Sequence, residues 1–175
     1  MNITIRDATI DDAAAIAKVN IASWQSTYRG LIGDATLDAM RFEDYLKKWN
    51  SILSLPQNEN VCFVAESDKE GIIGYFLCGE KQFEKYSFEG ELFAIYLLKE
   101  YQGQGIGKRL FLKSVEELKH RGIHSFLLFV LSSNTGSRKF YESFEPDFIA
   151  KEIITIDNKQ YSDTCYGWSD IRSIS

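Results

Sequence analysis

Cysteine and histidine are scarce in this chain of 175 residues, which has three of the former and two of the latter. Cys62, Cys78 and Cys165 are far apart and lie in apolar or aromatic stretches. An odd number without close spacing argues against a disulfide framework and a zinc site, so we expect buried free thiols rather than a catalytic cysteine. His120 and His124 flank one turn, which leaves little material for a Cys–His pair. No cluster of metal ligands is visible, and we expect no metal.

Long apolar runs and an excess of positive charge are also missing. No stretch approaches the roughly 18 apolar residues that a membrane-spanning helix needs. Residues 1–7 lack the basic-then-apolar order of a secretory signal. The formal net charge is -5, and an acidic chain repels the nucleic-acid backbone. We therefore expect a cytoplasmic protein that binds neither membrane nor nucleic acid. The same charge suits a cationic partner such as an amine.

Material for a core is ample, because 45% of the residues are hydrophobic and 14% are aromatic. The length fits one domain, residues 1–175, better than two small ones. We find no internal repeat, low-complexity tract or flexible linker.

Hydrophobic periodicity predicts both helices and strands. Four helices are expected at residues 9–28, 42–53, 105–121 and 135–144, with a short helical turn at 36–40. Strands are expected at residues 3–5, 61–65, 72–78, 91–98, 126–131, 148–156 and 160–168. The order is one strand, helices, antiparallel strands, an alternation of strands and helices, and a closing hairpin. This order predicts a single-domain mixed α/β fold.

A glycine cluster, Gln102-Gly103-Gln104-Gly105-Ile106-Gly107, lies between the strand that ends at Leu98 and the next helix. Glycines at such a junction let the backbone turn sharply and come close to a ligand. The free N–H groups and the dipole of the helix then favour an anion. Lys108, Arg109 and Lys113 add positive charge within two turns. These features predict a phosphate-binding loop, the alternative being glycines that only cap the helix.

Two common phosphate-binding patterns fail on this loop. A P-loop would need a glycine at Gln102 and a serine or threonine at Arg109. The third glycine of a dinucleotide-binding fingerprint would fall on Lys108 or Leu110. A nucleotide-phosphate protein is therefore disfavoured.

The loop resembles the acetyl-CoA loop of the GNAT superfamily of N-acetyltransferases, which reads Gln or Arg, two residues, Gly, one residue, then Gly or Ala. Gln102, Gly105 and Gly107 fill those places. Asn134 and the run Arg138-Lys139-Phe140-Tyr141-Glu142 are similar to a second signature of that superfamily.

The resemblance extends over nearly the whole chain. Ser23-Trp24-x-x-x-Tyr28-Arg29-Gly30 and Tyr166-Gly167-Trp168 are similar to a bacterial branch in which some members acetylate polyamines. Lys99 stands where the superfamily often has proline. Glu145-Pro146 stands where it usually has glycine, which leaves the end of the preceding helix open.

The resemblance implies a mostly antiparallel sheet whose central pair of strands splays apart to hold the pantetheine arm of acetyl-CoA. It implies that backbone groups of Ile95, Tyr96 and Leu97 bind that arm and polarise the carbonyl, since a bulged strand leaves such groups unpaired. Asn134 would bind the cofactor from the far side, or cap the following helix, or do both.

Tyr141 is implied as the acid that protonates the departing thiolate, the alternative being a core tyrosine. Glu91 opens the central strand and is the best candidate for the base, acting through water, although it could equally be an ordinary charge at a strand end.

Trp24 and Tyr28 are four residues apart and share one helix face, so we expect them, with Tyr96, near the acceptor, although an aromatic stripe is also typical of a core. The expected function is transfer of an acetyl group from acetyl-CoA to a primary amine, such as a polyamine or another small amine. A peptide or protein N-acetyltransferase and a non-catalytic acyl-CoA sensor remain as alternatives. The oligomeric state stays open between a monomer and a homodimer.

Overall fold

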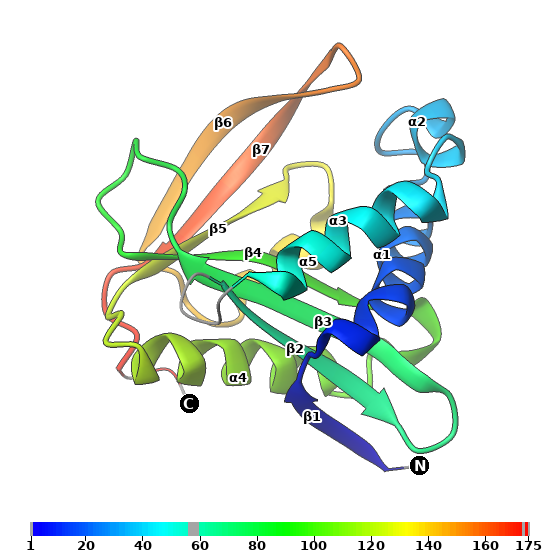
Figure 1. Cartoon of the computed structure of the whole chain (residues 1–175). Helices are drawn as coiled ribbons and strands as arrows, with labels where there is room; N and C mark the ends of the chain where they lie inside the picture. The colour runs from blue at the N-terminus through cyan, green and yellow to red at the C-terminus, as the bar shows by residue number, and fades with distance from the viewer. Residues whose placement is uncertain (1, 56–59, 173, 175) are drawn as a thin grey trace.

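A computed structural model of the chain describes residues 2–55, 60–172 and 174, and within them it contains seven strands and five α-helices in an α/β fold (Figure 1). The strands are β1 (Ile3–Asp7), β2 (Asn60–Ser67), β3 (Gly71–Glu80), β4 (Gly90–Leu97), β5 (Phe126–Leu131), β6 (Phe148–Ile156) and β7 (Lys159–Trp168). The helices are α1 (Ala13–Tyr28), α2 (Asp34–Asp38), α3 (Phe42–Ser54), α4 (Ile106–His120) and α5 (Thr135–Glu142). A short 3-10 turn, Lys99–Tyr101, precedes the glycine loop.

The strands form one mixed sheet in the order β1-β2-β3-β4-β5-β7-β6. Every neighbouring pair is antiparallel except β4 and β5, which are parallel because α4 connects them in sequence. The last pair, β6 and β7, forms a long hairpin that extends away from the body of the molecule (Figure 1). Its turn, Asp157-Asn158, has two residues with positive φ, as a tight hairpin requires.

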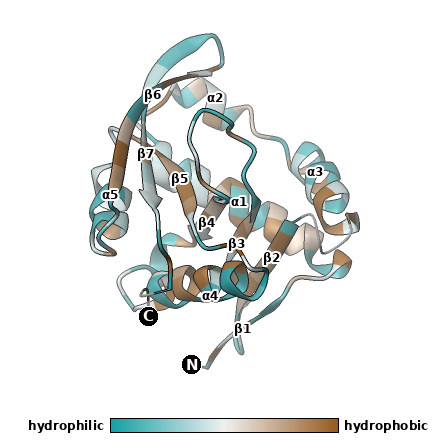
Figure 2. Ribbon diagram, turned by 90° about the vertical axis from the view of Figure 1, so that its left-hand side faces the viewer, coloured by the Kyte–Doolittle hydropathy of each residue, from teal (hydrophilic) through white to brown (hydrophobic). Residues whose placement is uncertain are grey.

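Helices cover both faces of the sheet and bury two main clusters of side chains. On one face, α1 and α3 pack over Val64 and Tyr75, and the indole nitrogen of Trp49 donates a hydrogen bond to Asn20 Oδ1 at 3.1 Å. On the other face, α4 buries Leu110, Phe111 and neighbouring apolar residues against the sheet. Figure 2 shows the hydrophobic colouring along the central strands and α4. Among the described residues, no helix combines the length and apolar character needed to cross a membrane.

The free cysteines follow the prediction, since Cys78 and Cys165 are buried and Cys62 is partly buried. Burial raises the pKa of Cys78 and of Cys165 to about 12. A thiol with such a pKa is protonated at neutral pH and is therefore a poor nucleophile.

The end of α5 has the backbone shape that a glycine would give. Glu145, which stands where a glycine was expected, has φ +53 and so adopts the left-handed conformation itself. A non-glycine residue pays a steric cost of about 1 kcal/mol there. The helix therefore ends as it would with a glycine, with Glu145 under backbone strain.

Candidate active site and family

The central strands separate soon after they begin. Gly90 pairs with Phe126 and Glu91 pairs with Leu127, and the parallel ladder ends there. The pairing of β4 with β3 shifts register between Leu92 and Ala94, so Phe93 is the extra residue of a bulge. Beyond Glu91, the β4 backbone no longer pairs with β5, which leaves backbone groups on that side for other partners; the carbonyl of Leu97 accepts from the side chain of Gln102. The predicted splayed pair of strands is confirmed.

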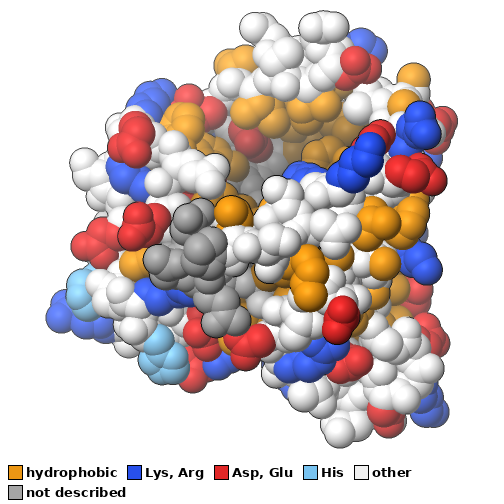
Figure 3. Space-filling model, in the orientation of Figure 1, with side chains coloured by type: hydrophobic (Ala, Val, Ile, Leu, Met, Phe, Trp, Pro, Cys, Tyr) orange, Lys and Arg blue, Asp and Glu red, His pale blue; other side chains and the backbone are white. Residues whose placement is uncertain are grey.

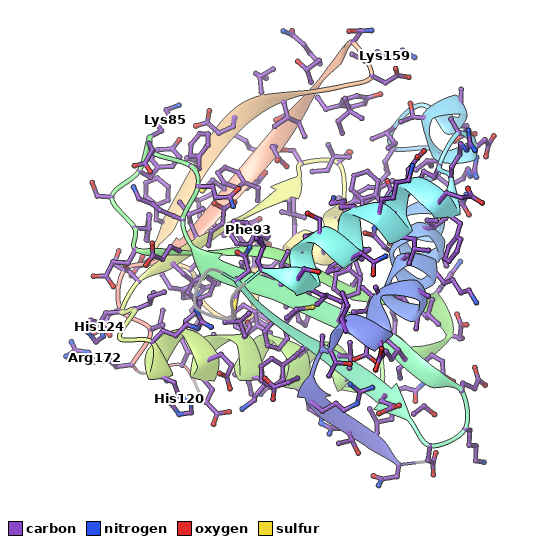
Figure 4. All side chains as sticks on the ribbon, in the orientation of Figure 1. Lys85, Phe93, His120, His124, Lys159 and Arg172 are labelled. Atoms are coloured by element: carbon purple, nitrogen blue, oxygen red, sulfur yellow. The ribbon has the colours of Figure 1, made fainter. Side chains whose placement is uncertain are left out.

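A cavity of about 1120 Å³ passes through this opening. Its walls come from the end of α1, from residues 92–97 of β4, from the glycine loop, from Phe129 and Val130 of β5, and from α5. Figure 3 shows a hollow with a largely hydrophobic floor in the upper part of the molecule, and Figure 4 shows Phe93 near the centre of the fold. The volume is large enough for two small molecules to meet.

The glycine loop forms one end of the cavity. Gly103 and Gly105 have φ +73 and +79, a conformation that side-chain-bearing residues rarely adopt. The side-chain amide of Gln102 donates a hydrogen bond to the carbonyl of Leu97 at 3.0 Å, which holds the loop against the end of β4. Gly107 lies in the first turn of α4, where unpaired N–H groups favour an anion.

Only one of the three predicted cations lines this end of the cavity. Lys108 is exposed and is part of the cavity wall. Arg109 instead donates to the carbonyl of Ile3 at 2.8 Å, and Lys113 forms ion pairs with Glu116 and Glu117. Because helical residues point in different directions, closeness in sequence did not bring all three to the loop.

Tyr141 lies on α5 and forms part of the cavity wall. Its ring packs against Phe111 and Phe140, with ring centres 6.1 and 5.1 Å apart. Burial raises the pKa of this phenol above its ordinary value, so it stays protonated at neutral pH. It is thus a hydrogen-bond donor positioned beside the gap between β4 and β5.

Asn134 also lines the cavity and is buried. Its Oδ1 accepts a hydrogen bond from the backbone N–H of Ser137 at 3.1 Å, which makes it the N-cap of α5. The capping role is therefore confirmed. The side-chain N–H₂ group is not used by the cap and remains a donor for a ligand.

Glu91 sits at the beginning of the opening. Its Oε2 accepts a hydrogen bond from the backbone N–H of Gln82 at 3.0 Å, so the loop before β4 holds it. Burial raises the pKa of this carboxyl, and the N–H groups of Gln82 and Phe83 oppose that effect. The cavity wall along β4 starts with the next residue, Leu92, so Glu91 lies just outside that wall.

Aromatic residues close the end of the cavity near α1. The hydroxyl groups of Tyr28 and Tyr96 lie within hydrogen-bond distance, and both residues line the cavity. Trp24 packs behind Tyr28, with the ring centres 4.9 Å apart in an edge-on arrangement. The three predicted aromatics are therefore brought together, although Trp24 supports the wall from behind.

Asp163 was missed by sequence reasoning; it does not line the cavity, but it is close enough to Tyr28 for its charge to raise the pKa of that phenol, after the larger effect of burial. It is buried, with 6% of its surface exposed, and lies on β7 between Tyr161 and Cys165 in the alternation of the strand. An acidic residue within an apolar stripe was the signal that could have singled it out. Within the described part of the chain, no group of three histidine, cysteine or acidic side chains could hold a metal ion.

The chain matches known proteins along most of its length. Residues 21–145 match the model of the acetyltransferase (GNAT) family. An uncharacterized N-acetyltransferase, YuaI, of Bacillus subtilis is 31% identical over 98% of this chain and 96% of its own. The spermidine N(1)-acetyltransferase of Thermoplasma acidophilum is 28% identical over 81% of this chain and 86% of its own.

The fold has a close counterpart among solved structures. The PaiA N-acetyltransferase of Thermoplasma acidophilum, solved in complex with coenzyme A, superimposes with a TM-score of 0.73 at 24% identity. The match covers 96% of this chain and 100% of that one. The glycine loop, the opened sheet and these matches agree, and the chain belongs to the acetyltransferase (GNAT) family as an acetyl-CoA-dependent N-acetyltransferase.

Proposed function

We propose that this enzyme transfers the acetyl group of acetyl-CoA to a primary amine of a small cationic molecule of the polyamine type. The observation that carries the proposal is the gap between β4 and β5, which connects the glycine loop to an aromatic end of the same cavity. A spermidine acetyltransferase among the relatives supports the choice of acceptor class.

Acetyl-CoA fits the loop end of the cavity. The residues proposed to contact its pyrophosphate are Gln102, Gly103, Gln104, Gly105, Ile106, Gly107 and Lys108. A side chain at Gly105 or Gly103 would need an unfavourable backbone, which leaves their N–H groups open to close approach. The pantetheine arm would run along the free edge of β4 at Ile95, Tyr96 and Leu97, with Asn134 donating from the opposite wall.

The reaction needs a neutral amine, a polarised carbonyl and a proton for the thiolate. The amine nitrogen attacks the thioester carbon, the C–S bond breaks, and one amine proton leaves through water to Glu91. A free N–H group of β4 stabilises the oxygen of the tetrahedral intermediate. The Tyr141 hydroxyl donates to the sulfur as negative charge develops there.

Glu91 and Tyr141 differ in protonation, as these roles require. The raised pKa of Tyr141 keeps its hydroxyl protonated, so that it can donate a hydrogen bond to the sulfur. The raised pKa of Glu91 makes its carboxylate a better proton acceptor than an exposed one. Tyr28, with Trp24 behind it, would hold the ammonium group or alkyl stem of the acceptor, since cation–π contacts stabilise by about 0.5 to 2 kcal/mol.

Thiol release from acetyl-CoA, measured with a panel of acceptors, tests the proposal. The panel contains spermidine, putrescine, amino acids, aminoglycosides and short peptides. We expect the highest kcat/KM for the di- and polyamines. Selective turnover of peptides would instead indicate a protein N-acetyltransferase. Tight binding of acetyl-CoA with no turnover of any acceptor would indicate a sensor.

A further inference from the structure

Asp163 presents a buried carboxylate oxygen that lacks a partner. With 94% of its surface covered, its Oδ1 has no hydrogen-bond partner among the described residues. Burial raises the pKa of this carboxyl to about 6, opposed by the backbone N–H of Thr164 and by Lys151. The group is therefore still ionised at neutral pH. A buried oxygen without a hydrogen-bond partner is costly, so Oδ1 is expected to have a partner that the described residues of the protein do not supply.

Asp163 is not part of the cavity wall itself, but the register of the strands places it next to residues that pack against that wall. It pairs with Leu131 of β5, which packs in one cluster with Trp24 and Tyr28. Two residues along the same face of β7, Cys165 pairs with Phe129 and packs in a second cluster with it. Tyr28 and Phe129 both line the cavity. Asp163 thus lies on the strand face that the acceptor end occupies.

Among the described residues, the charged groups around Asp163 form no ion pair with it, although Lys151 is close enough to lower its pKa. Lys151 is on the opposite face of the hairpin, paired with Thr164, and its ammonium donates to Ser132 Oγ and Thr164 Oγ1. Glu152 is paired with Asp163 across the hairpin, so the two side chains share one face. The Oε1 of Glu152 forms an ion pair with the ammonium of Lys85 at 2.6 Å. Tyr28, on α1, is close enough for the charge of Asp163 to raise its phenol pKa, although burial is the larger cause.

The reacting amine cannot be the lasting partner of a carboxylate, because it must lose its proton before it attacks. An ammonium that stays charged must belong to a second amine of the same molecule. Resting on the function proposed above, we propose that Asp163 binds the second, non-reacting ammonium group of a diamine or polyamine acceptor. Asp163 is then a specificity-determining residue that selects acceptors with two amines over acceptors with one.

Putrescine (butane-1,4-diamine) and butylamine make a matched pair of acceptors, since they differ only in the second amine. In the wild-type enzyme we expect the diamine to have a kcat/KM about ten- to a hundredfold higher, as expected for one charge-assisted contact. Asp163→Asn should remove this preference through KM, while the kcat/KM for butylamine and the Kd for coenzyme A stay within about twofold. Asp163→Ser should act in the same way and guards against an effect peculiar to asparagine.

Glu152→Gln is the matched control, because it neutralises the adjacent carboxylate that already has a partner. It should keep the preference for the diamine. Equal kcat/KM for the two amines in the wild type, or a preference that survives Asp163→Asn, would overturn the assignment. So would loss of the preference in Glu152→Gln alone.

Binding separates this proposal from the acetyl-transfer function. Calorimetric titration of butane-1,4-diamine into protein saturated with coenzyme A should give an affinity that falls at least about tenfold in Asp163→Asn. If the diamine binds in a way that depends on Asp163 but no thiol is released, the acetyl-transfer function is overturned and the ammonium site at Asp163 is retained. Thiol release with equal diamine affinity in both proteins would overturn the site and keep the function.

Discussion

The phenol oxygens of Tyr28 and Tyr96 lie 3.1 Å apart and join the end of α1 to the end of β4. This contact crosses the cavity wall where the acceptor is proposed to enter. It fixes the position of an aromatic ring from a helix relative to the backbone that is proposed to hold the thioester. We therefore expect the two tyrosines to set the distance between the acceptor and the acetyl group.

Tyr28→Phe should raise the KM for the amine about two- to tenfold, the equivalent of one lost hydrogen bond, with little change in the KM for acetyl-CoA. Tyr45→Phe, on α3, is the control and should change neither constant. Steady-state kinetics with both substrates varied gives the two values. An equal rise in both would mean that the contact holds the whole fold rather than the acceptor end.

Gly107→Val should weaken coenzyme A binding at least about tenfold while the melting temperature stays nearly unchanged. Gly107 is the informative position because its φ is not in the left-handed range, and a Cβ would meet only Phe140 at ordinary contact distance. Gly105 is a poorer choice, since φ +79 would strain any side chain. Gly33→Ala, away from the cavity, is the control. Wild-type affinity in Gly107→Val would remove the loop from the binding site.

Tyr141→Phe should lower kcat about a hundredfold, within the usual range for loss of a catalytic proton donor, and leave the Kd for acetyl-CoA unchanged. The substitution removes only the hydroxyl, so packing against Phe111 survives. Tyr101→Phe is the control, because Tyr101 is an equally buried tyrosine of the turn after β4. Unchanged turnover in Tyr141→Phe would make Tyr141 a core residue.

Glu91→Gln should lower kcat about tenfold at pH 7 and less at pH 9 to 10, because more of the amine is already neutral there. For the wild type, the raised pKa of Glu91 moves the acidic limb of the pH–rate profile to a higher pH than an ordinary carboxyl group would give. Profiles of kcat/KM for both proteins check this. Parallel profiles of equal height would mean that water alone takes the proton.

Asp163→Asn should be more stable than the wild type in the absence of ligand, and this difference should be larger at pH 7.5 than at pH 4.5. The folded-state pKa of about 6 is above the ordinary value of 3.8, so the native state binds the extra proton between those values. Stability of the wild type therefore falls as the pH rises through that window, by up to about 3 kcal/mol from this group. Urea unfolding of both proteins at the two pH values gives the difference. A difference that does not grow with pH would show that the charge of Asp163 costs nothing.

The sequence could predict much of the fold because its elements are strongly patterned. The apolar run of β5, the turn at Asp157-Asn158 and the amphipathic α4 each specify local structure without help from distant residues. The order of the elements then limits the sheet to few arrangements.

The site was only partly accessible from the sequence. The glycine loop and Tyr141 carry local signatures, whereas the position of Arg109 depends on where its side chain meets β1. The burial of Asp163 appears only when β7 is paired with β5 and β6 on its two sides. Its place in the alternation of β7 could have singled it out, but the lack of a partner for its Oδ1 among the described residues is a property of the assembled sheet.

The early separation of β4 from β5 places a sheet edge inside the protein. Free peptide edges on a surface recruit other strands and lead to aggregation, and natural proteins usually shield them. Here the edge is recessed within a cavity walled by Tyr28, Phe129 and Tyr141. A slender chain with its own amide groups can reach it and bind as a substitute strand, whereas a neighbouring polypeptide meets side chains first. The unpaired backbone groups of β4 are therefore accessible to a ligand in the cavity but shielded from strands of other copies of the protein.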